Sequence, residues 1–281
     1  MDEARGEYGK LRFEELNYGS YLRIPELLAL QQLRSKPPHH DEMFFIVIHQ
    51  SFELWFKEVL HELDLLGEHL AAGSVSRALK TVKRVNAILD CLVQQIQLLA
   101  TLTPVEFAGF RSALGAGSGF QSLQFREIEF TCGLRDDFFV EFFGRWPESA
   151  ARLRSRAEAP SVYDHFLRAL AKSGHAVPKE VLERDVRAPH ALDPRVVAII
   201  HGLYQRPRED YHWVLLAEAL LDLDTNWSKW RAVHILMVTR TIGGQAGTGG
   251  SAGAVFLESR LKMRFFPELW EVRNAVWGEA S

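Results

Sequence analysis

The chain contains little cysteine and little net charge, and each shortage excludes a class of protein. Its 281 residues include only two cysteines, Cys91 and Cys132, which lie far apart. They cannot form a Cys-x-x-Cys redox pair, a zinc ribbon or a disulfide framework, so a reducing cytoplasm is the expected location. The 33 Lys and Arg residues against 36 Asp and Glu residues give a formal net charge of −3. Proteins that bind nucleic acids or anionic membranes usually need a clear basic excess, which this chain lacks.

Long apolar runs and strand patterns are also missing. The first ten residues, MDEARGEYGK, lack the apolar run of a signal peptide, and no stretch of about 18 uncharged apolar residues occurs. We find no sustained period-two alternation and no Asn-Gly or Asp-Gly hairpin. What is plentiful is histidine, tryptophan and phenylalanine, with 11, 7 and 18 residues. Metal or redox chemistry would therefore have to use histidine.

Helical periodicity runs through most of the chain. Apolar residues recur every three or four positions over 41–70, over 79–99 and, in the longest element, from 209 to about 242. Thr103-Pro104-Val105-Glu106 is a strong helix start, because the threonine can cap, the proline suits the first turn and the glutamate can bond back to the cap. Shorter helices are expected over 120–132, 161–172 and 194–204, before Phe266 and from Pro267 onward, with an irregular connection over 174–192. The pattern predicts one all-α domain over 1–281, a helical bundle with long core helices.

Two histidines lie on the apolar stripes of these long helices. His49 falls between Phe45 and Phe52, and His234 lies one turn after Trp230. A lone histidine on an apolar face is usually a hydrogen-bonded core residue. The alternative is a heme slot, with one imidazole as axial ligand and the other as a distal polar group, because such a slot needs an apolar lining and one imidazole. The residues alone leave both interpretations open.

The glycine-rich stretch over 243–253 formally matches a dinucleotide-binding pattern at 247–252. A helix precedes it where a strand is required, and no Gly-Lys-Ser/Thr follows, so neither a Rossmann loop nor a phosphate-binding P-loop is indicated. The stretch is either a flexible connector or a mobile active-site loop whose N–H groups and Thr248 hydroxyl hold a carboxylate. Arg111, four residues after Phe107 on the capped helix, is by itself a solvated helix charge.

Two zinc-like patterns are weak. His61-Glu62 opens like a zincin motif, but Leu65 stands where the second histidine is needed. His39-His40-Asp41-Glu42 is a run of metal-binding residue types, yet adjacent loop residues rarely converge on one ion. We interpret it as a helix start with Asp41 as a possible cap.

Several blocks, spread from about Leu16 to Val272, match one known family in its order. They are Tyr18-Gly-Ser-Tyr-Leu22, Pro38-His-His-Asp-Glu-Met43, Phe45-Ile-Val-Ile-His49-Gln50, Glu53-Leu-Trp55, Thr101-Leu-Thr-Pro104, Gly109-Phe-Arg111, Ser118-Gly-Phe-Gln-Ser-Leu-Gln124, Ile128-Glu-Phe130, Gly247-Thr-Gly-Gly-Ser251 and Phe265-Phe-Pro-Glu-Leu269. With these blocks the chain resembles the tryptophan 2,3-dioxygenase family, cytoplasmic histidine-ligated heme oxygenases.

The resemblance implies a role for each matching position. His234 matches the axial heme ligand, and His49 matches the distal, catalytic histidine that hydrogen-bonds the indole N–H. The substrate contacts implied are Phe45 as a pocket wall, Phe107 beside the carboxylate site, Arg111 on the carboxylate, Ser118 over the heme and Thr248 on the ammonium and carboxylate groups. The resemblance further implies one heme b per subunit, ferrous for dioxygen binding, and a homotetramer built as a dimer of dimers. In such an assembly Tyr18, Tyr21 and Leu22, within the 1–40 segment, complete a neighbouring subunit's site.

The chain also departs from the family pattern at several positions. Ser51-Phe52 replaces a usual Thr-Ser, Phe107 stands where tyrosine is common, Ile96 replaces a frequent tryptophan, and Gly244-Gln245-Ala246 lacks the usual basic pair. The expected function is 2,3-dioxygenation of L-tryptophan to N-formylkynurenine. The alternatives are a monooxygenase that forms a 2-oxindole from a modified, for instance β-methyl, tryptophan in specialised metabolism, and a non-catalytic heme sensor.

Overall fold

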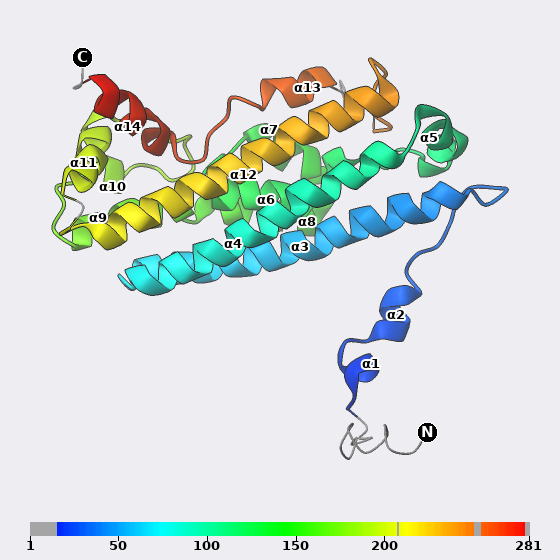
Figure 1. Cartoon of the computed structure of the whole chain (residues 1–281), viewed down its shortest axis with the longest axis horizontal. Coiled ribbons are helices and arrows are strands. Elements are labelled where there is room, and N and C mark those ends of the chain that lie inside the picture. Colours follow the sequence, from blue (N-terminus) through cyan, green and yellow to red (C-terminus); the bar gives the residue numbers. More distant parts are fainter. Residues whose placement is uncertain (1–15, 207, 250–253, 279–281) are drawn as a thin grey trace, which may run out of the picture.

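The computed structural model describes residues 16–206, 208–249 and 254–278, and every regular element in these ranges is a helix. The predicted all-α fold is confirmed. Three long helices form its frame: α3 (His40–Ala71), α4 (Val75–Ile96) and α12 (Tyr211–Ile242). They lie side by side along the long axis of the molecule, with α4 in contact with both of the others (Figure 1).

The frame is held together by the apolar stripes that the sequence periodicity predicts. Most residues of each stripe are buried, and the buried ones form one continuous core. Its largest fully buried side chain is Trp227 on α12, which is 1% exposed. Because the stripes repeat over many turns, the three helices stay in contact along most of their length.

Shorter helices cover the frame. Against α3 lie α6 (Leu123–Thr131) and α9 (Val162–Lys172), and α8 (Pro147–Glu158) packs on α6. At one end α11 (Pro194–Gln205) contacts α14 (Pro267–Gly278). The remaining elements are α5 (Pro104–Arg111), α7 (Asp137–Phe142), α10 (Lys179–Leu182), α13 (Ala254–Ser259) and 3-10 turns over 97–101, 112–114, 119–121 and 143–145.

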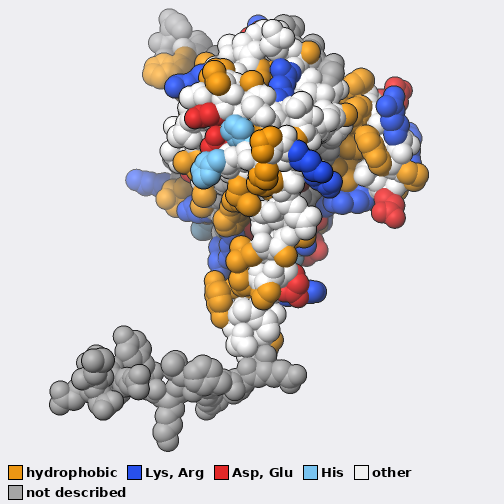
Figure 2. Space-filling model, turned by 90° about the vertical axis from the view of Figure 1, so that its right-hand side faces the viewer, with side chains coloured by type: hydrophobic (Ala, Val, Ile, Leu, Met, Phe, Trp, Pro, Cys, Tyr) orange, Lys and Arg blue, Asp and Glu red, His pale blue; other side chains and the backbone are white. Residues whose placement is uncertain are grey.

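An N-terminal arm extends away from this body. It carries α1 (Tyr18–Tyr21) and α2 (Ile24–Leu28), and Figure 1 shows it projecting from the bundle. Figure 2 shows hydrophobic side chains along it. Gln50 fixes its inner end to α3, because its Nε2 donates to the Leu30 carbonyl at 3.3 Å and its Oε1 accepts from Gln31 Nε2 at 2.5 Å. The arm therefore begins next to His49 and then leaves the bundle.

Some local predictions need correction. The predicted helix over 120–132 is divided at Ser122, whose hydroxyl caps α6 after a 3-10 turn. His39 caps α3, accepting from the Asp41 N–H at 3.3 Å, so Asp41 is not the cap. The connection over 174–192 contains α10, and the helix expected before Phe266 ends at Ser259.

The described residues contain no single helix that is long and apolar enough to cross a membrane. One bent pair, Val75–Thr101 with Pro104–Leu114, passes that test by length and composition only.

Candidate functional site

A cavity of about 540 Å³ opens between α3, α5, α6 and α12. Apolar and aromatic side chains make most of its wall, and a few polar groups point into it. This volume lies within the range of small-molecule and cofactor sites, roughly 300–1,000 Å³. Seven of the residues singled out from the sequence line it: Phe45, His49, Phe107, Arg111, Ser118, His234 and Thr248.

His234 stands on α12 at one wall of the cavity. Its ring stacks on Trp230, with centroids 4.9 Å apart, and Trp230 in turn contacts Phe125 of α6 at 5.1 Å. Burial lowers the pKa of His234 to about 4, and the nearby His49 and Arg126 side chains also disfavour a second positive charge there. At neutral pH this imidazole is uncharged, so it retains a nitrogen lone pair that can bind a metal.

His49 reaches the same cavity from α3. Its Nδ1 lies 2.7 Å from the carbonyl oxygen of Phe45, one turn earlier, and its ring lies 4.1 Å from the Phe45 ring. A carbonyl only accepts hydrogen bonds, so Nδ1 carries the proton. Burial lowers the pKa of His49 and keeps the ring neutral, although the Phe45 carbonyl and Glu53 oppose the shift. The other nitrogen, Nε2, is therefore a hydrogen-bond acceptor.

Arg111 and Thr248 connect α5 and its following turn to the glycine-rich loop. Arg111 Nη2 donates to the carbonyl of Ala246 at 2.6 Å, and the Thr248 hydroxyl donates to the carbonyl of Gly117. A Cβ atom on Gly249 would lie 2.8 Å from Cβ of Ser118, so only glycine fits this approach. Residues 246–249 of the loop thus lie at the cavity beside Arg111.

Aromatic side chains hold α5, which carries Arg111, against α3. The Phe45 ring contacts Phe107 and Phe110 at 5.7 and 5.5 Å, which joins α3 to α5. Next to them, a Cβ atom on Gly109 would lie 2.6 Å from Nε2 of His39. His39 therefore sits in a notch of α5 that the absence of a side chain creates.

Three predicted site residues lie elsewhere. Tyr18, Tyr21 and Leu22 are 77%, 71% and 43% exposed on the arm and are absent from the wall of this chain's cavity. Their expected role in a neighbouring subunit stays a prediction. The weak metal pattern at 39–42 is structural, because Glu42 accepts from the backbone N–H groups of Arg34 and Ser35. No group of three or more His, Cys, Asp or Glu residues in the described ranges could hold a metal ion.

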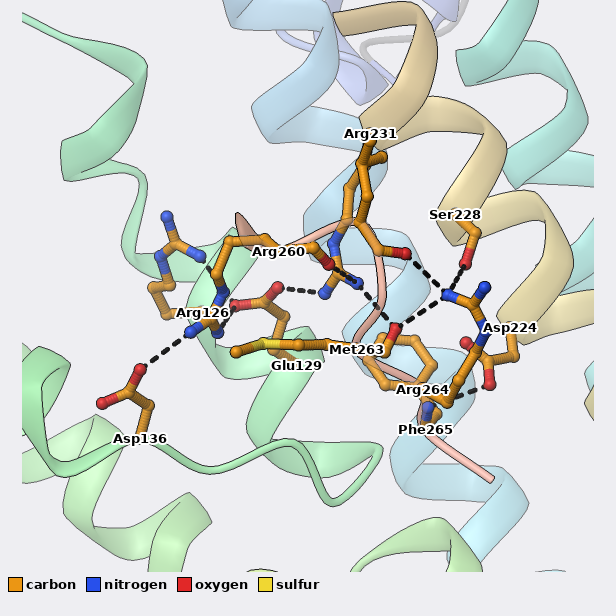
Figure 3. A network of polar contacts seen from close by, with 11 residues as sticks. Arg126, Glu129, Asp136, Asp224, Ser228, Arg231, Arg260, Met263, Arg264 and Phe265 are labelled. Atoms are coloured by element: carbon orange, nitrogen blue, oxygen red, sulfur yellow. Dashed lines mark hydrogen bonds and ion pairs between the residues drawn. The ribbon is translucent and has the colours of Figure 1, made fainter. Parts of the chain in front are cut away.

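The sequence did not single out the charged wall of the cavity. Arg126 and Glu129 of α6, Arg231 of α12 and Arg260 after α13 converge there (Figure 3). Burial would raise the pKa of Glu129, but the three guanidinium groups outweigh it and lower this pKa to about 2. The sequence contains one indication of this wall, since charged residues at 126, 129 and 231 interrupt apolar stretches. Their convergence depends on tertiary contacts that periodicity does not reveal.

Comparison with known proteins gives one consistent result. A family model described as tryptophan 2,3-dioxygenase matches residues 4–154 and 197–276. A protein named tryptophan 2,3-dioxygenase from Herpetosiphon aurantiacus is 45% identical over 260 residues, which cover 92% of this chain and 98% of that protein. Proteins of the same name from Saccharopolyspora erythraea and Kineococcus radiotolerans are 44% and 45% identical, covering 93% of this chain and 93% and 92% of their own lengths.

Proposed function

Since the chain belongs to the tryptophan 2,3-dioxygenase family, we propose that it is a heme-dependent enzyme that inserts both atoms of dioxygen into L-tryptophan and forms N-formylkynurenine. One observation carries the proposal. Two neutral imidazoles, His49 on α3 and His234 on α12, line a single apolar cavity with an arginine, Arg111, at its rim.

The residues of the cavity fit a heme. Its wall is mainly apolar and aromatic, as a porphyrin requires, and its volume is that of a cofactor site. His234 is the axial ligand in this proposal, because its uncharged ring can donate a lone pair and stacking on Trp230 fixes its orientation. When bound, the heme iron supplies the binding and activation of dioxygen.

His49 and Arg111 orient the substrate. The acceptor nitrogen of His49 suits the N–H of an indole, and Phe45 offers its ring as an apolar wall. The guanidinium of Arg111 suits the amino-acid carboxylate, and the Thr248 hydroxyl lies two residues after Ala246, to which Arg111 is bonded. Holding both ends of tryptophan fixes the position of the indole C2–C3 bond. The substrate then has a high effective concentration at the place where it reacts.

The glycine-rich loop excludes water during the reaction in this proposal. What supports this is that Ala246 and Thr248, in the described part of the loop, are bonded to Arg111 and Gly117 beside the cavity. A substrate carboxylate would compete with the Ala246 carbonyl for Arg111, so binding and loop position are coupled. Because both oxygen atoms enter the product, the reaction consumes no external reductant per turnover.

We place Tyr18, Tyr21 and Leu22 of the arm at a neighbouring subunit's site in a cytoplasmic homotetramer with one heme b per subunit. What supports this is the exposure of these three side chains, which lie on an arm that projects from the body (Figure 1).

The test is reconstitution of the chain with heme, followed by reduction and addition of tryptophan in air. We expect one dioxygen consumed for each N-formylkynurenine formed, without further reductant. His234→Ala should lose the Soret band of bound heme, whereas His212→Ala, an exposed position on the same helix, should keep it. Heme binding without substrate-dependent oxygen consumption would contradict the proposal and favour a sensor.

A further inference from the structure

Three buried arginines line one wall of the cavity, and the proposed function uses none of them. Arg126, Arg231 and Arg260 are each 5% exposed, and they come from α6, α12 and the segment after α13. Figure 3 shows their guanidinium groups gathered around Glu129.

The positive charges of this cluster outnumber its negative charges. Glu129 is fully buried and pairs with Arg126 at 2.7 Å, with Arg231, and with Arg260 at the longer distance of 3.5 Å. Arg260 also meets Asp136 at 2.8 Å, an acid whose side chain is 35% exposed. Three buried cations thus share one buried and one partly exposed carboxylate. An excess charge in an apolar cavity is costly unless an anion pairs with it.

Several buried N–H groups of the cluster also have no hydrogen-bond partner. Arg231 is well used, because it bonds to Glu129 and to the carbonyls of Arg260 and Met263 at 3.3 Å. Arg126 bonds to Glu129 through Nη1, but its buried Nε has no partner. Arg260 bonds to Asp136 through Nη1, while its buried Nε and Nη2 have no hydrogen-bond partner. Two of the three guanidinium groups therefore have donors left for a ligand.

Position distinguishes this cluster from Arg111. Arg126 follows Phe125, whose ring packs on Trp227 and Trp230 at 4.5 and 5.1 Å, and Trp230 stacks on His234. The guanidinium of Arg126 is held over Phe139 at 3.8 Å. Arg111 instead lies beside the glycine-rich loop. The two cationic groups thus occupy different parts of the wall.

We propose that Arg126, with Arg260 beside it, forms a second anion subsite in the cavity, which binds a carboxylate of the porphyrin, whereas Arg111 binds the carboxylate of the amino acid. This inference rests on the proposed heme. A porphyrin with two propionates supplies the missing negative charge from the group that His234 holds. The subsite would then fix the rotation of the ring about the His234 bond.

The test compares two porphyrins that differ only in these carboxylates. The apo protein is titrated with iron protoporphyrin IX and with its dimethyl ester, and binding is followed by the Soret band. Arg126→Gln leaves Glu129 paired with Arg231 and Arg260, so the fold should persist. We expect this variant to bind the free acid about tenfold or more weakly, in line with a lost charge-assisted hydrogen bond, and the ester unchanged.

Arg152→Gln is the matched control, because Arg152 pairs with Glu127 on α6 but does not line the cavity. It should leave both affinities unchanged. Resonance Raman of the propionate-bending bands gives a second readout, which should shift in Arg126→Gln and not in the control. Should Arg126→Gln fail to fold by circular dichroism, Arg260→Gln should show the same selective loss.

Equal weakening of both porphyrins would assign Arg126 a structural role and overturn the proposal, as would no weakening at all. Weaker tryptophan binding with unchanged porphyrin binding would give the subsite to the amino acid, which also overturns it. If the unsubstituted chain bound neither porphyrin, the proposed function itself would fail, and this assignment with it.

Discussion

At the scale of single residues, burial determines the chemistry of both cavity imidazoles. It lowers the pKa of His234 to about 4 and also lowers that of His49. The two differ in their partners: the Phe45 carbonyl fixes the tautomer of His49, and Trp230 stacks on His234. One ring thus offers a hydrogen-bond acceptor to the cavity, and the other keeps a lone pair that the proposed heme iron could bind.

The lowered pKa of His234 predicts acid sensitivity of the apo protein. Between about pH 6.5 and 4 the unfolded chain binds a proton at this histidine and the native chain does not, so the free energy of unfolding falls as the pH falls. The full effect for one such group is about 3 kcal/mol. Urea denaturation at pH 7, 5.5 and 4 should show a smaller loss for His234→Gln than for the wild type. Parallel pH dependences of the two proteins would contradict the assignment.

Arg111 should control recognition of the amino-acid carboxylate. Replacing it by leucine removes a charge-assisted hydrogen bond, so KM for tryptophan should rise about 10- to 100-fold while heme stays bound. Tryptamine is the control ligand, because it lacks the carboxylate. Its affinity for the reconstituted protein should be the same in Arg111→Leu and in the unsubstituted chain. A KM for tryptophan that does not change would leave Arg111 as a surface charge.

From the sequence, single site residues were predictable only where they interrupt a regular apolar pattern or match a family motif. His49 and His234 stand out on apolar stripes, and both line the cavity. Arg111 looked solvated until a family resemblance gave it a role, because its bond to Ala246 joins residues 135 positions apart. Arg126 and Arg260 were not predicted for the same reason: they meet only once α6 and the segment after α13 come together.

At the scale of elements, the position of α5 against α3 determines the substrate end of the cavity. His39, which caps α3, fills the notch at Gly109, and Phe45 contacts Phe107 and Phe110. Phe107 and Arg111 are carried by α5, whereas Phe45 and His49 are carried by α3. Any shift between the two helices would therefore misplace the groups proposed to hold tryptophan.

Gly109→Ala should disturb this junction. The added methyl group would lie 2.6 Å from Nε2 of His39, so helix or ring must move, at a cost of about 1–3 kcal/mol. We expect a lower melting temperature and a raised KM for tryptophan with heme retained. Gly202→Ala is the control, since a Cβ atom there meets nothing within 4 Å and alanine favours the helix. An unchanged KM in Gly109→Ala would show that the notch does not position the site.

Long helices were the best predicted elements. The stripes over 41–70 and from 209 give α3 (His40–Ala71) and α12 (Tyr211–Ile242) almost to the residue, because many turns repeat one pattern. A proline also marks the start of a shorter helix, since Pro147 begins α8 as a first-turn proline. The arm helices were missed, since α1 and α2 bury no residue and show no stripe.

At the scale of the whole molecule, the exposed arm predicts association between copies of the chain. Leu28 and Leu30 are 69% and 63% exposed, which is unusual for neighbouring apolar side chains on a projecting segment. Replacing both by serine should shift the mass in multi-angle light scattering from a tetramer toward smaller species. Leu192→Ser, in the connection before α11, should leave the mass unchanged. A tetramer that persists in the double variant would show that these leucines do not hold the assembly.

The central claim is that this cavity directs both atoms of dioxygen into tryptophan, and the fate of the oxygen atoms tests it most directly. The heme-loaded, reduced protein is mixed anaerobically with L-tryptophan, then with ¹⁸O₂, and the quenched product is analysed by mass spectrometry. We predict N-formylkynurenine that carries two labelled oxygen atoms. A 2-oxindole product with a single labelled atom would contradict the claim.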